Sequence, residues 1–158
     1  MPDPACAAGN TLRTLNEPNG DLRFCAKPNG EREGPFVKVH ASGALRDRGS
    51  YHTDKLHGAW STWDEKGTMR EQGAYREGTL TGYWTAFHAN GRKQATKEYT
   101  AAGLRRGVWS TWDENGKLVE EGEYRENEKH GFWTTWDPKT GKMLTTVEYA
   151  NGQLRPKR

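Results

Sequence analysis

The aromatic residues of this chain recur at fixed distances from a series of glycines. These glycines are 24, 24, 25 and 24 residues apart, and they are Gly34, Gly58, Gly82, Gly107 and Gly131. The second position after each glycine holds Phe36, Trp60, Trp84, Trp109 and Trp133. The fifth holds Val39, Trp63, Phe87, Trp112 and Trp136, and a later column holds Tyr51, Tyr75, Tyr99, Tyr124 and Tyr149. Self-similarity at a fixed period is the signature of a repeat protein.

Each period has the pattern of two short β-strands joined by a turn. Apolar residues do not recur at helical spacing and Gly is too frequent for a helix, whereas Trp, Thr and Tyr favour strands. The segments DEKG, HANG, DENG and PKTG suit a type I turn closed by a left-handed Gly with a bulge. A second turn is expected at REGTLTG and RENEKHG. Each period is therefore predicted to be one β-hairpin.

A lone hairpin is marginal in water, so the hairpins must stack on one another. The sequence predicts an all-β fold, an elongated single-layer twisted antiparallel sheet of about five stacked β-hairpin repeats. The expected organisation is an N-terminal cap at 1–33, repeats at 34–57, 58–81, 82–106, 107–130 and 131–154, and a basic tail at 155–158. Within the cap, Phe24-Cys25 is expected to form a short strand that pairs with the first repeat.

The spacing of the aromatic columns predicts which face of the sheet each one occupies. Trp60 and Trp63 are three positions apart, so in a regular strand they point to opposite faces unless a bulge intervenes. A further column has even spacing to the tyrosines and is expected to share their face: Leu45, Met69, Lys93, Leu118 and Met143. Lys93 departs from this column, and Lys97 stands where repeats one, two and four have Gly. Both departures are expected to weaken repeat three.

The run GAYREGTLTGYWTAFHANG, from Gly73 to Gly91, resembles the MORN repeat. It differs in having Trp84 where the standard motif has a second close Gly, and Trp60, Trp109 and Trp133 make the same change. That change is typical of the bacterial variant of the MORN repeat. The resemblance covers about residues 30 to 154. It implies a non-catalytic array of hairpins that acts as a scaffold, in a family for which partner binding, dimerisation and phospholipid contact have been proposed.

Composition excludes some classes of partner. The net charge is +3, from 24 basic and 21 acidic residues, so nothing indicates the basic stripe of a nucleic-acid-binding protein. The only basic cluster is Arg155, Lys157 and Arg158, which is interpreted as a solvated tail. No apolar run approaches the ~20 residues of a transmembrane helix. No signal peptide is visible at residues 1–8, although the chain can still be a mature fragment.

Cys6 and Cys25 are the two cysteines, and both lie in the predicted cap. A disulfide between them would close a loop of about 20 residues and stabilise the fold by roughly 3 kcal/mol. It would also favour an extracytoplasmic location, because disulfides persist in oxidising compartments. Two unrelated thiols and a metal site are the alternatives, but no CxxC or Cys–His spacing supports a metal.

No catalytic constellation stands out. His40 and His88 share one column with Asp64, Asp113 and Asp137, but neighbours in that column are ~10 Å apart, too far to ligate one metal. These positions suit residues that open β-turns. Phosphate-binding loops and nucleophile motifs are absent from the sequence. The prediction is a non-enzymatic protein without cofactor or metal.

The aromatic ladder is the feature best suited to binding, although packing between hairpins explains it more simply. Its candidate residues are Trp60, Trp63, Trp84, Phe87, Trp109, Trp112, Trp133 and Trp136. The leading hypothesis is a scaffold that presents an extended β-surface to another protein. The alternative is an envelope or surface module that binds glycans or phospholipid headgroups by aromatic contacts, with membrane contact at most peripheral. The edge strand near Lys142 to Tyr149, followed by a Pro-containing charged tail, is protected by charge or forms a homodimer.

Overall fold

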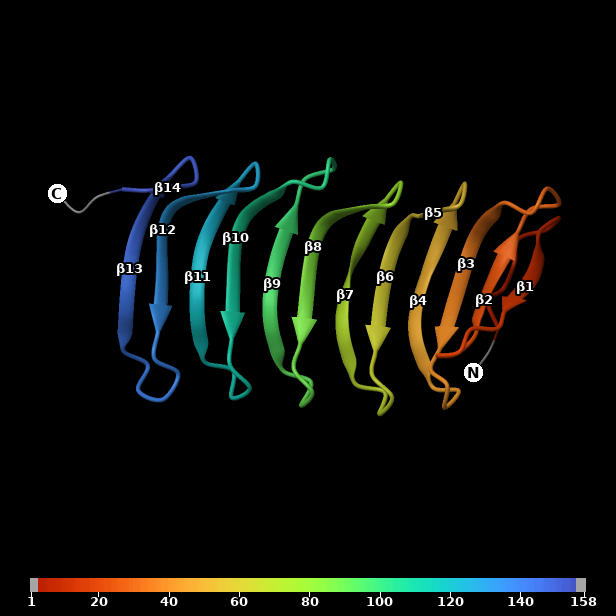
Figure 1. The fold of residues 1–158 in the computed structure, drawn as a ribbon, viewed down its shortest axis with the longest axis horizontal. Coiled ribbons are helices and arrows are strands. Elements are labelled where there is room, and N and C mark those ends of the chain that lie inside the picture. The colour runs from red at the N-terminus through yellow and green to blue at the C-terminus, as the bar shows by residue number, and fades with distance from the viewer. Residues whose placement is uncertain (1–2, 156–158) are drawn as a thin grey trace. The chain divides into compact units, whose positions relative to one another are not determined.

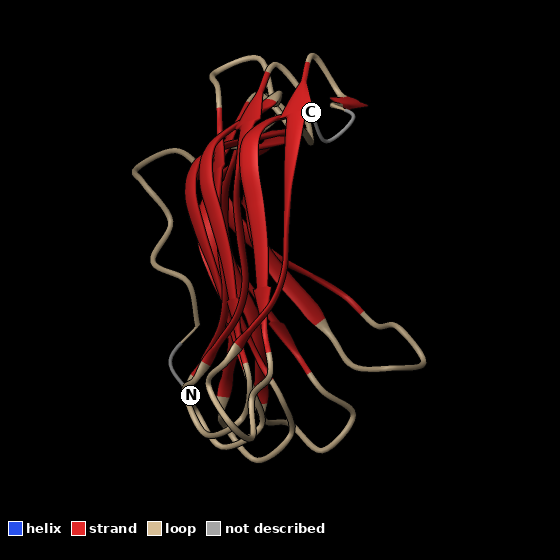
Figure 2. Cartoon of the chain, turned by 90° about the vertical axis from the view of Figure 1, so that its left-hand side faces the viewer, coloured by secondary structure: helices blue, strands red, loops and turns tan. Residues whose placement is uncertain are grey.

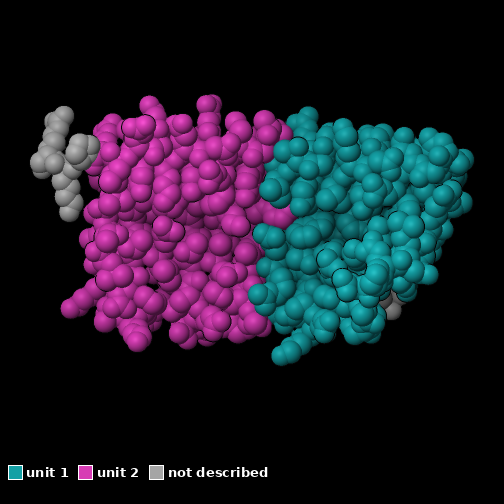
Figure 3. All heavy atoms as spheres, in the orientation of Figure 1, with its two compact units in different colours: residues 1–80 teal, residues 81–158 magenta. Residues whose placement is uncertain are grey.

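The computed structural model describes residues 3–155. The chain divides into two compact units, Met1–Leu80 and Thr81–Arg158 (Figure 3). All regular structure in the described residues is β-strand, and loops join the strands (Figure 2). The predicted all-β class is therefore confirmed. No helix in this part of the chain is long and apolar enough to cross a membrane.

Unit 1 is an open antiparallel sheet in hairpin order (Figure 1). Its strands follow the order β1-β2-β3-β4-β6-β7, and the short β5 pairs with β4. The bounds are β1 Thr11–Leu15, β2 Leu22–Ala26, β3 Arg32–Val39, β4 Leu45–His52, β5 Lys55–Leu56, β6 Gly58–Trp63 and β7 Met69–Arg76. The expected strand at Phe24-Cys25 is confirmed as part of β2, which pairs with β3. The hairpin that β2 forms with β1 was not predicted.

Unit 2 has the same architecture, with strand order β8-β9-β10-β11-β12-β13-β14. The bounds are β8 Thr79–Phe87, β9 Lys93–Tyr99, β10 Arg105–Trp112, β11 Leu118–Arg125, β12 Glu128–Trp136, β13 Met143–Ala150 and β14 Gln153–Leu154. The last strand corrects the sequence analysis, which expected only a charged tail after β13. Instead, the chain turns back in a short hairpin, and β14 pairs antiparallel with Tyr149 and Ala150 of β13.

The first turn of each hairpin is the predicted bulged turn. In DEKG the N–H of Gly67 donates to the Asp64 carbonyl at 2.9 Å, and the N–H of Asp64 donates to the Thr68 carbonyl at 2.9 Å. Gly67 has φ +81°, in the left-handed region that favours glycine. Equivalent bonds form at His88–Gly91 and Asp113–Gly116. The glycines that the period placed at these turns are therefore required by backbone geometry.

The second turns explain the one irregular step of the repeat. Four of them have two consecutive residues with positive φ, as a type I′ turn requires: Thr53-Asp54, Glu77-Gly78, Glu126-Asn127 and Asn151-Gly152. Repeat three turns through Thr100–Gly103 instead, where the N–H of Gly103 donates to the Thr100 carbonyl at 3.0 Å. This bulged turn is one residue longer than a type I′ turn. It accounts for the 25-residue step between Gly82 and Gly107.

A bulge in the second strand of each hairpin corrects one prediction about faces. Trp60 lies opposite Gly73 and Trp63 lies opposite Met69, with the register shifting between Thr62 and Trp63. Directly opposed residues share a face. Met69 therefore lies on the face of Trp63, away from Tyr75, and the prediction that its column shares the tyrosine face is wrong. The first strand is regular, so Trp60 and Trp63 do point to opposite faces.

The core of unit 1 lies on the tyrosine face, next to the N-terminal hairpin. Its buried members are Leu22, Phe24, Ala26 and Phe36, and Tyr51, Leu56 and Trp60 pack against them. Cys25 points to the other face, where it is fully buried and forms a disulfide with Cys6. An ion pair between Asp3 and Arg23, 2.9 Å long, holds the same N-terminal segment to this face. The favoured interpretation of the two cysteines is therefore confirmed.

Candidate functional site

Within each unit, the second-position aromatics and the tyrosines stack on one another. We call the side of the sheet that carries them the ladder face. In unit 2 the ring centroids of Tyr99 and Trp109 are 5.4 Å apart, those of Trp109 and Tyr124 are 4.8 Å apart, and those of Tyr124 and Trp133 are 5.0 Å apart. All three pairs meet edge to face, the arrangement that aromatic quadrupoles prefer. In unit 1 Phe36 and Tyr51 are 4.7 Å apart. The stack therefore stabilises successive hairpins.

Glycine makes room for the indoles on the ladder face. A Cβ atom on Gly122 would lie 2.1 Å from the Trp133 ring, and one on Gly49 would lie 2.8 Å from Phe36 and 3.2 Å from Trp60. A ring therefore lies directly over the glycine of the neighbouring strand. Gly122 is also the cross-strand partner of Trp109. Repeat three has Lys97 at this position, opposite Trp84.

Three cations lie over the rings of unit 2. The Lys129 ammonium is 3.9 Å from the centre of the Trp133 ring and 5.2 Å from that of Tyr149. The Arg105 guanidinium is 4.3 Å from the Tyr124 ring, and the Lys97 ammonium is 5.9 Å from the Trp109 ring. Such contacts attract the cation to the negative ring face.

The turn residue Asn127 fixes Arg105 in this position. Its N–H donates to Oδ1 of Asn127 at 2.7 Å, and its guanidinium donates to the Asn127 carbonyl at 2.9 Å. Arg32 makes the equivalent contacts to Asp54 in unit 1, and its guanidinium lies 4.4 Å from the centre of the Tyr51 ring. The turn of each of these hairpins therefore orients an arginine over a tyrosine of the same hairpin.

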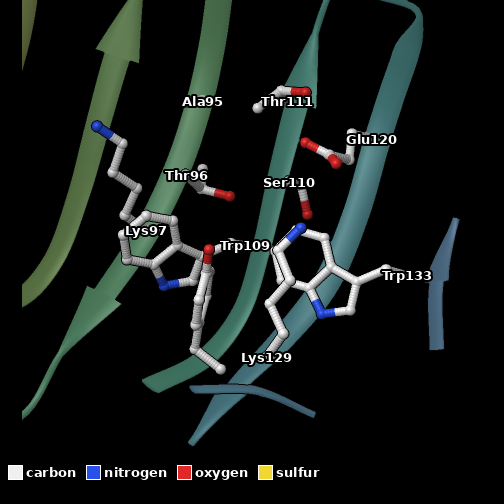
Figure 4. A pocket seen from close by; sticks show the side chains of 10 residues that line it. Ala95, Thr96, Lys97, Trp109, Ser110, Thr111, Glu120, Lys129 and Trp133 are labelled. Carbon is white, nitrogen blue, oxygen red and sulfur yellow. The ribbon is translucent and has the colours of Figure 1, made fainter. Parts of the chain in front are cut away.

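A small pocket opens on the ladder face of unit 2 (Figure 4). Its volume is about 120 Å³. Its walls are the rings of Trp109, Tyr124 and Trp133, with Ala95 and Thr111 alongside. Lys97, Lys129 and Glu120 also border it, and β9, β10, β11 and β12 supply all of these side chains. The pocket therefore combines aromatic walls with charged groups.

The opposite face of unit 2 carries a row of exposed apolar side chains. These are Tyr83, Val108 and Phe132, with exposed fractions of 77%, 56% and 67%. We call them the exposed row. Each stands one position after a repeat glycine, a column in which repeats one and two have the small residues Pro35 and Ala59. This row was not predicted from the sequence, and the contrast in size along the column was the signal available.

An ion pair accompanies each member of the exposed row. The residues opposite Tyr83, Val108 and Phe132 are Glu98, Glu123 and Glu148. The carboxylates pair with Arg106 at 2.9 Å, Arg125 at 2.9 Å and Arg155 at 2.7 Å. The three arginines are exposed, and surface ion pairs contribute little to stability. They make a charged border beside an apolar row.

The predicted ladder residues divide between the two faces. Trp84 and Trp133 are buried, with 3% and 5% of their surface exposed, and Trp60 and Trp109 are half-buried on the same face. The fifth-position residues lie on the opposite face and are half-buried: Trp63, Phe87, Trp112 and Trp136. The indole N–H of Trp133 donates to the Glu123 carbonyl at 3.1 Å, so its polar atom is used within the fold. A binding role for the ladder as a whole stays a prediction.

The histidine and aspartate column consists of turn residues. His40 Nε2 is 2.9 Å from the Trp63 carbonyl oxygen, and His88 Nε2 is 2.8 Å from that of Trp112. Each histidine therefore links its turn to the next hairpin.

The aspartates of this column accept hydrogen bonds from their own turns. Asp113 Oδ1 accepts from the N–H groups of Lys117 at 2.8 Å and Asn115 at 2.9 Å. These bonds lower the pKa of Asp113, and equivalent bonds lower the pKa of Asp64 and Asp137. Within the described residues, no group of three or more His, Cys, Asp or Glu is placed to hold a metal ion.

One acidic side chain of unit 1 has a strongly shifted pKa. Glu33 accepts a hydrogen bond from the N–H of Thr53 at 3.0 Å, and its other oxygen lies 3.0 Å from His52 Nδ1. The bond from Thr53, followed by those from His52 and Lys27, lowers the pKa of Glu33 to about 2. The same carboxylate raises the pKa of His52. These groups join a turn to β3 and face solvent, which indicates a structural role.

Comparison with known proteins places these repeats in a class. The family model of the MORN repeat variant matches residues 105–126, which cover β10 and β11. Both units are antiparallel sheets of successive hairpins, which is consistent with an array of such repeats. Residues 105–126 are therefore similar to one copy of the MORN repeat variant.

No curated protein matches the chain. Among solved structures, it is similar to a chain in a GtfA/B complex bound to UDP and GlcNAc, with 11% identity and a TM-score of 0.29. That alignment covers 87% of this chain and 24% of the other, so the chain spans about a quarter of the length of the protein it matches.

Proposed function

We propose that this protein is a non-enzymatic scaffold that binds another protein through the exposed row of unit 2. The observation that carries the proposal is the exposure of Tyr83, Val108 and Phe132 at one position of three successive repeats. Scattered apolar side chains are normal on a surface, whereas an aligned set with a polar border is typical of an interaction site. Aromatic residues are also enriched at the centres of protein interfaces.

The test is to change the row and measure partner retention. Tyr83, Val108 and Phe132 are replaced together by Ser, and affinity capture from the native source is compared with that of the unchanged protein. The matched control replaces Leu12 and Leu15 by Ser, since these are also exposed apolar residues and lie outside both proposed interaction surfaces. We expect at least one protein to be captured by the unchanged chain and by the control but not by the row variant. Equal retention by all three would contradict the proposal.

We also propose that the protein works in an oxidising, extracytoplasmic compartment. The Cys6–Cys25 disulfide is compatible with such a location. The test is thiol labelling of the protein in its native source before lysis. Blocked cysteines that become reactive only after reduction support the proposal, and free thiols in the native protein contradict it.

A homodimer through the edge of β13 is a second interaction that we propose. β14 covers this strand only at Tyr149 and Ala150, and Met143 and Leu144 are 61% and 62% exposed. Unpaired strand edges offer backbone groups to another strand. Light scattering after size exclusion tests the proposal. A concentration-dependent dimer that Leu144→Lys abolishes supports it, and a monomer at all concentrations contradicts it.

A further inference from the structure

Basic side chains lie over the rings of the ladder face in unit 2, and two of them, Lys97 and Lys129, border the pocket. Lys97 replaces the glycine that repeats one, two and four have at the same position. Lys129 and Arg105 stand two positions before their repeat glycines, a position that Arg32 occupies in repeat one and that Leu56 and Leu80 occupy in repeats two and three. Departures from local structural rules are expected where a protein has a function to serve. Here Lys97, Arg105 and Lys129 add positive charge around the rings of Trp109, Tyr124 and Trp133.

These cations are not used to balance charge within the fold. Neither the Lys97 nor the Lys129 ammonium makes an ion pair with a carboxylate in the described part of the chain. Their ammonium groups are instead 5.9 Å and 3.9 Å from the ring centres of Trp109 and Trp133, and both side chains line the pocket that Figure 4 shows. Glu120 is the one carboxylate among the lining residues. The border of the pocket therefore has an excess of positive charge.

We infer that this pocket binds an acidic segment of a partner polypeptide. Carboxylates of the segment pair with Lys97 and Lys129 on the two sides of the pocket, and an aliphatic stem or the peptide backbone packs on the Trp109 ring between them. Charge complementarity selects the acidic partner. This inference deepens the proposed protein-binding function by naming the chemistry of a bound segment, and it rests on that function.

The size of the pocket favours a side chain over a larger ligand. Pockets for small molecules usually enclose about 300–1,000 Å³, whereas this one encloses about 120 Å³. A single side chain in a small aromatic pocket is the usual form of an anchor at a protein interface. An acidic glycan would also meet lysines and indoles, so it is an outcome that the test must separate.

The test uses the whole protein and a synthetic peptide of alternating Glu and Gly with blocked ends. Indole N–H resonances of Trp109 and Trp133 are followed by NMR as the peptide is added. The variant Lys97→Gly with Lys129→Leu restores the residues that other repeats have, so we expect it to stay folded with unchanged thermal unfolding. Lys97→Arg with Lys129→Arg keeps the charge. The control variant, Lys66→Gln with Lys142→Gln, removes two turn lysines outside the pocket.

We expect saturable shifts of both indole signals with the unchanged protein, the Arg variant and the control. In the Gly/Leu variant the affinity falls about tenfold, which is the loss expected for two exposed charge pairs. A peptide with Gln in place of Glu should bind no better to the unchanged protein than to that variant. The inference is overturned by absent shifts, by equal affinity in the Gly/Leu variant, or by binding of an oligogalacturonate where the peptide does not bind. The Ser variant of the exposed row should bind the peptide normally, so either proposal can fail without the other.

Discussion

A Cβ atom placed on Gly122 would lie 2.1 Å from Cδ2 of the Trp133 indole. The indole therefore packs directly against the backbone of the neighbouring strand, at a distance that only glycine permits. The same relation joins Gly49 to Phe36 and Trp60. The glycines of the second strands thus set how closely one hairpin packs against the next.

Gly122→Ala is expected to destabilise the protein by about 1–3 kcal/mol or more, because the added methyl group displaces the Trp133 indole from its packing position. Urea unfolding measures the loss, and tryptophan emission should shift as well. Gly116→Ala is the control. Its Cβ meets nothing within 4 Å, but its φ of +84° is strained for alanine, which costs roughly 1–2 kcal/mol. An unchanged emission spectrum and midpoint in Gly122→Ala would contradict this packing.

Trp133→Ala should cost about 3–5 kcal/mol, the usual loss for a buried aromatic residue. Trp133 is 5% exposed and contacts Tyr124, whereas Trp112 on the opposite face is only half-buried. We therefore expect a smaller loss for Trp112→Ala. Denaturant unfolding of the two variants gives the comparison directly. Equal losses would show that the opposite-face column packs as tightly as the ladder face.

Cys6→Ser should lower the free energy of unfolding by about 3 kcal/mol, the value for a loop of this length. The two cysteines are 19 positions apart, and Cys25 is fully buried. Unfolding with and without reductant measures the effect, and the variant should be insensitive to reductant. Intact mass with and without reductant checks that the bond is present. A midpoint that reduction leaves unchanged would refute the stabilising role.

Much of the fold could be read from residue spacing because glycine and tryptophan have few alternatives at their positions. Gly67 and Gly116 require left-handed backbone, so their period marks the turns. The three-residue interval between Trp60 and Trp63 fixed their opposite faces, since the first strand is regular. Met69 was misplaced because the bulge lies on the second strand. Side-chain spacing alone does not reveal an extra residue in a ladder of backbone hydrogen bonds.

The candidate sites were harder to predict because they depend on what the repeat leaves uncovered. Phe132 and Val108 are exposed because no other side chains among residues 3–155 cover their column. The pattern of residues along the sequence does not reveal this. Lys97 was noticed as a departure but interpreted as a weakness of repeat three. The structure instead places its ammonium 5.9 Å from the centre of the Trp109 ring, at the border of a pocket. The replacement of glycine by Lys97 lies at the candidate site. Recognising this required knowing which residues surround the Lys97 side chain.

Acid should destabilise the protein as Glu33 becomes protonated. Hydrogen bonds from Thr53 and His52 lower its pKa from an ordinary value of 4.5 to about 2 in the folded state. A carboxylate with a lowered pKa contributes stability above its unfolded pKa, and that contribution is lost as the pH falls through its folded pKa. The loss therefore falls between about pH 4.5 and pH 2. Glu33→Gln should flatten the pH dependence of the urea midpoint in this window.

The matched control for this prediction is Glu114→Gln, a carboxylate at an exposed turn whose side chain makes no ion pair in the described residues. Its pH profile should follow that of the unchanged protein. Asp64, Asp113 and Asp137 also have lowered pKa values, because N–H groups of their turns donate to them. Glu33→Gln should therefore remove only part of the acid sensitivity. A profile identical to that of the unchanged protein would show that the contacts of Glu33 do not persist in solution.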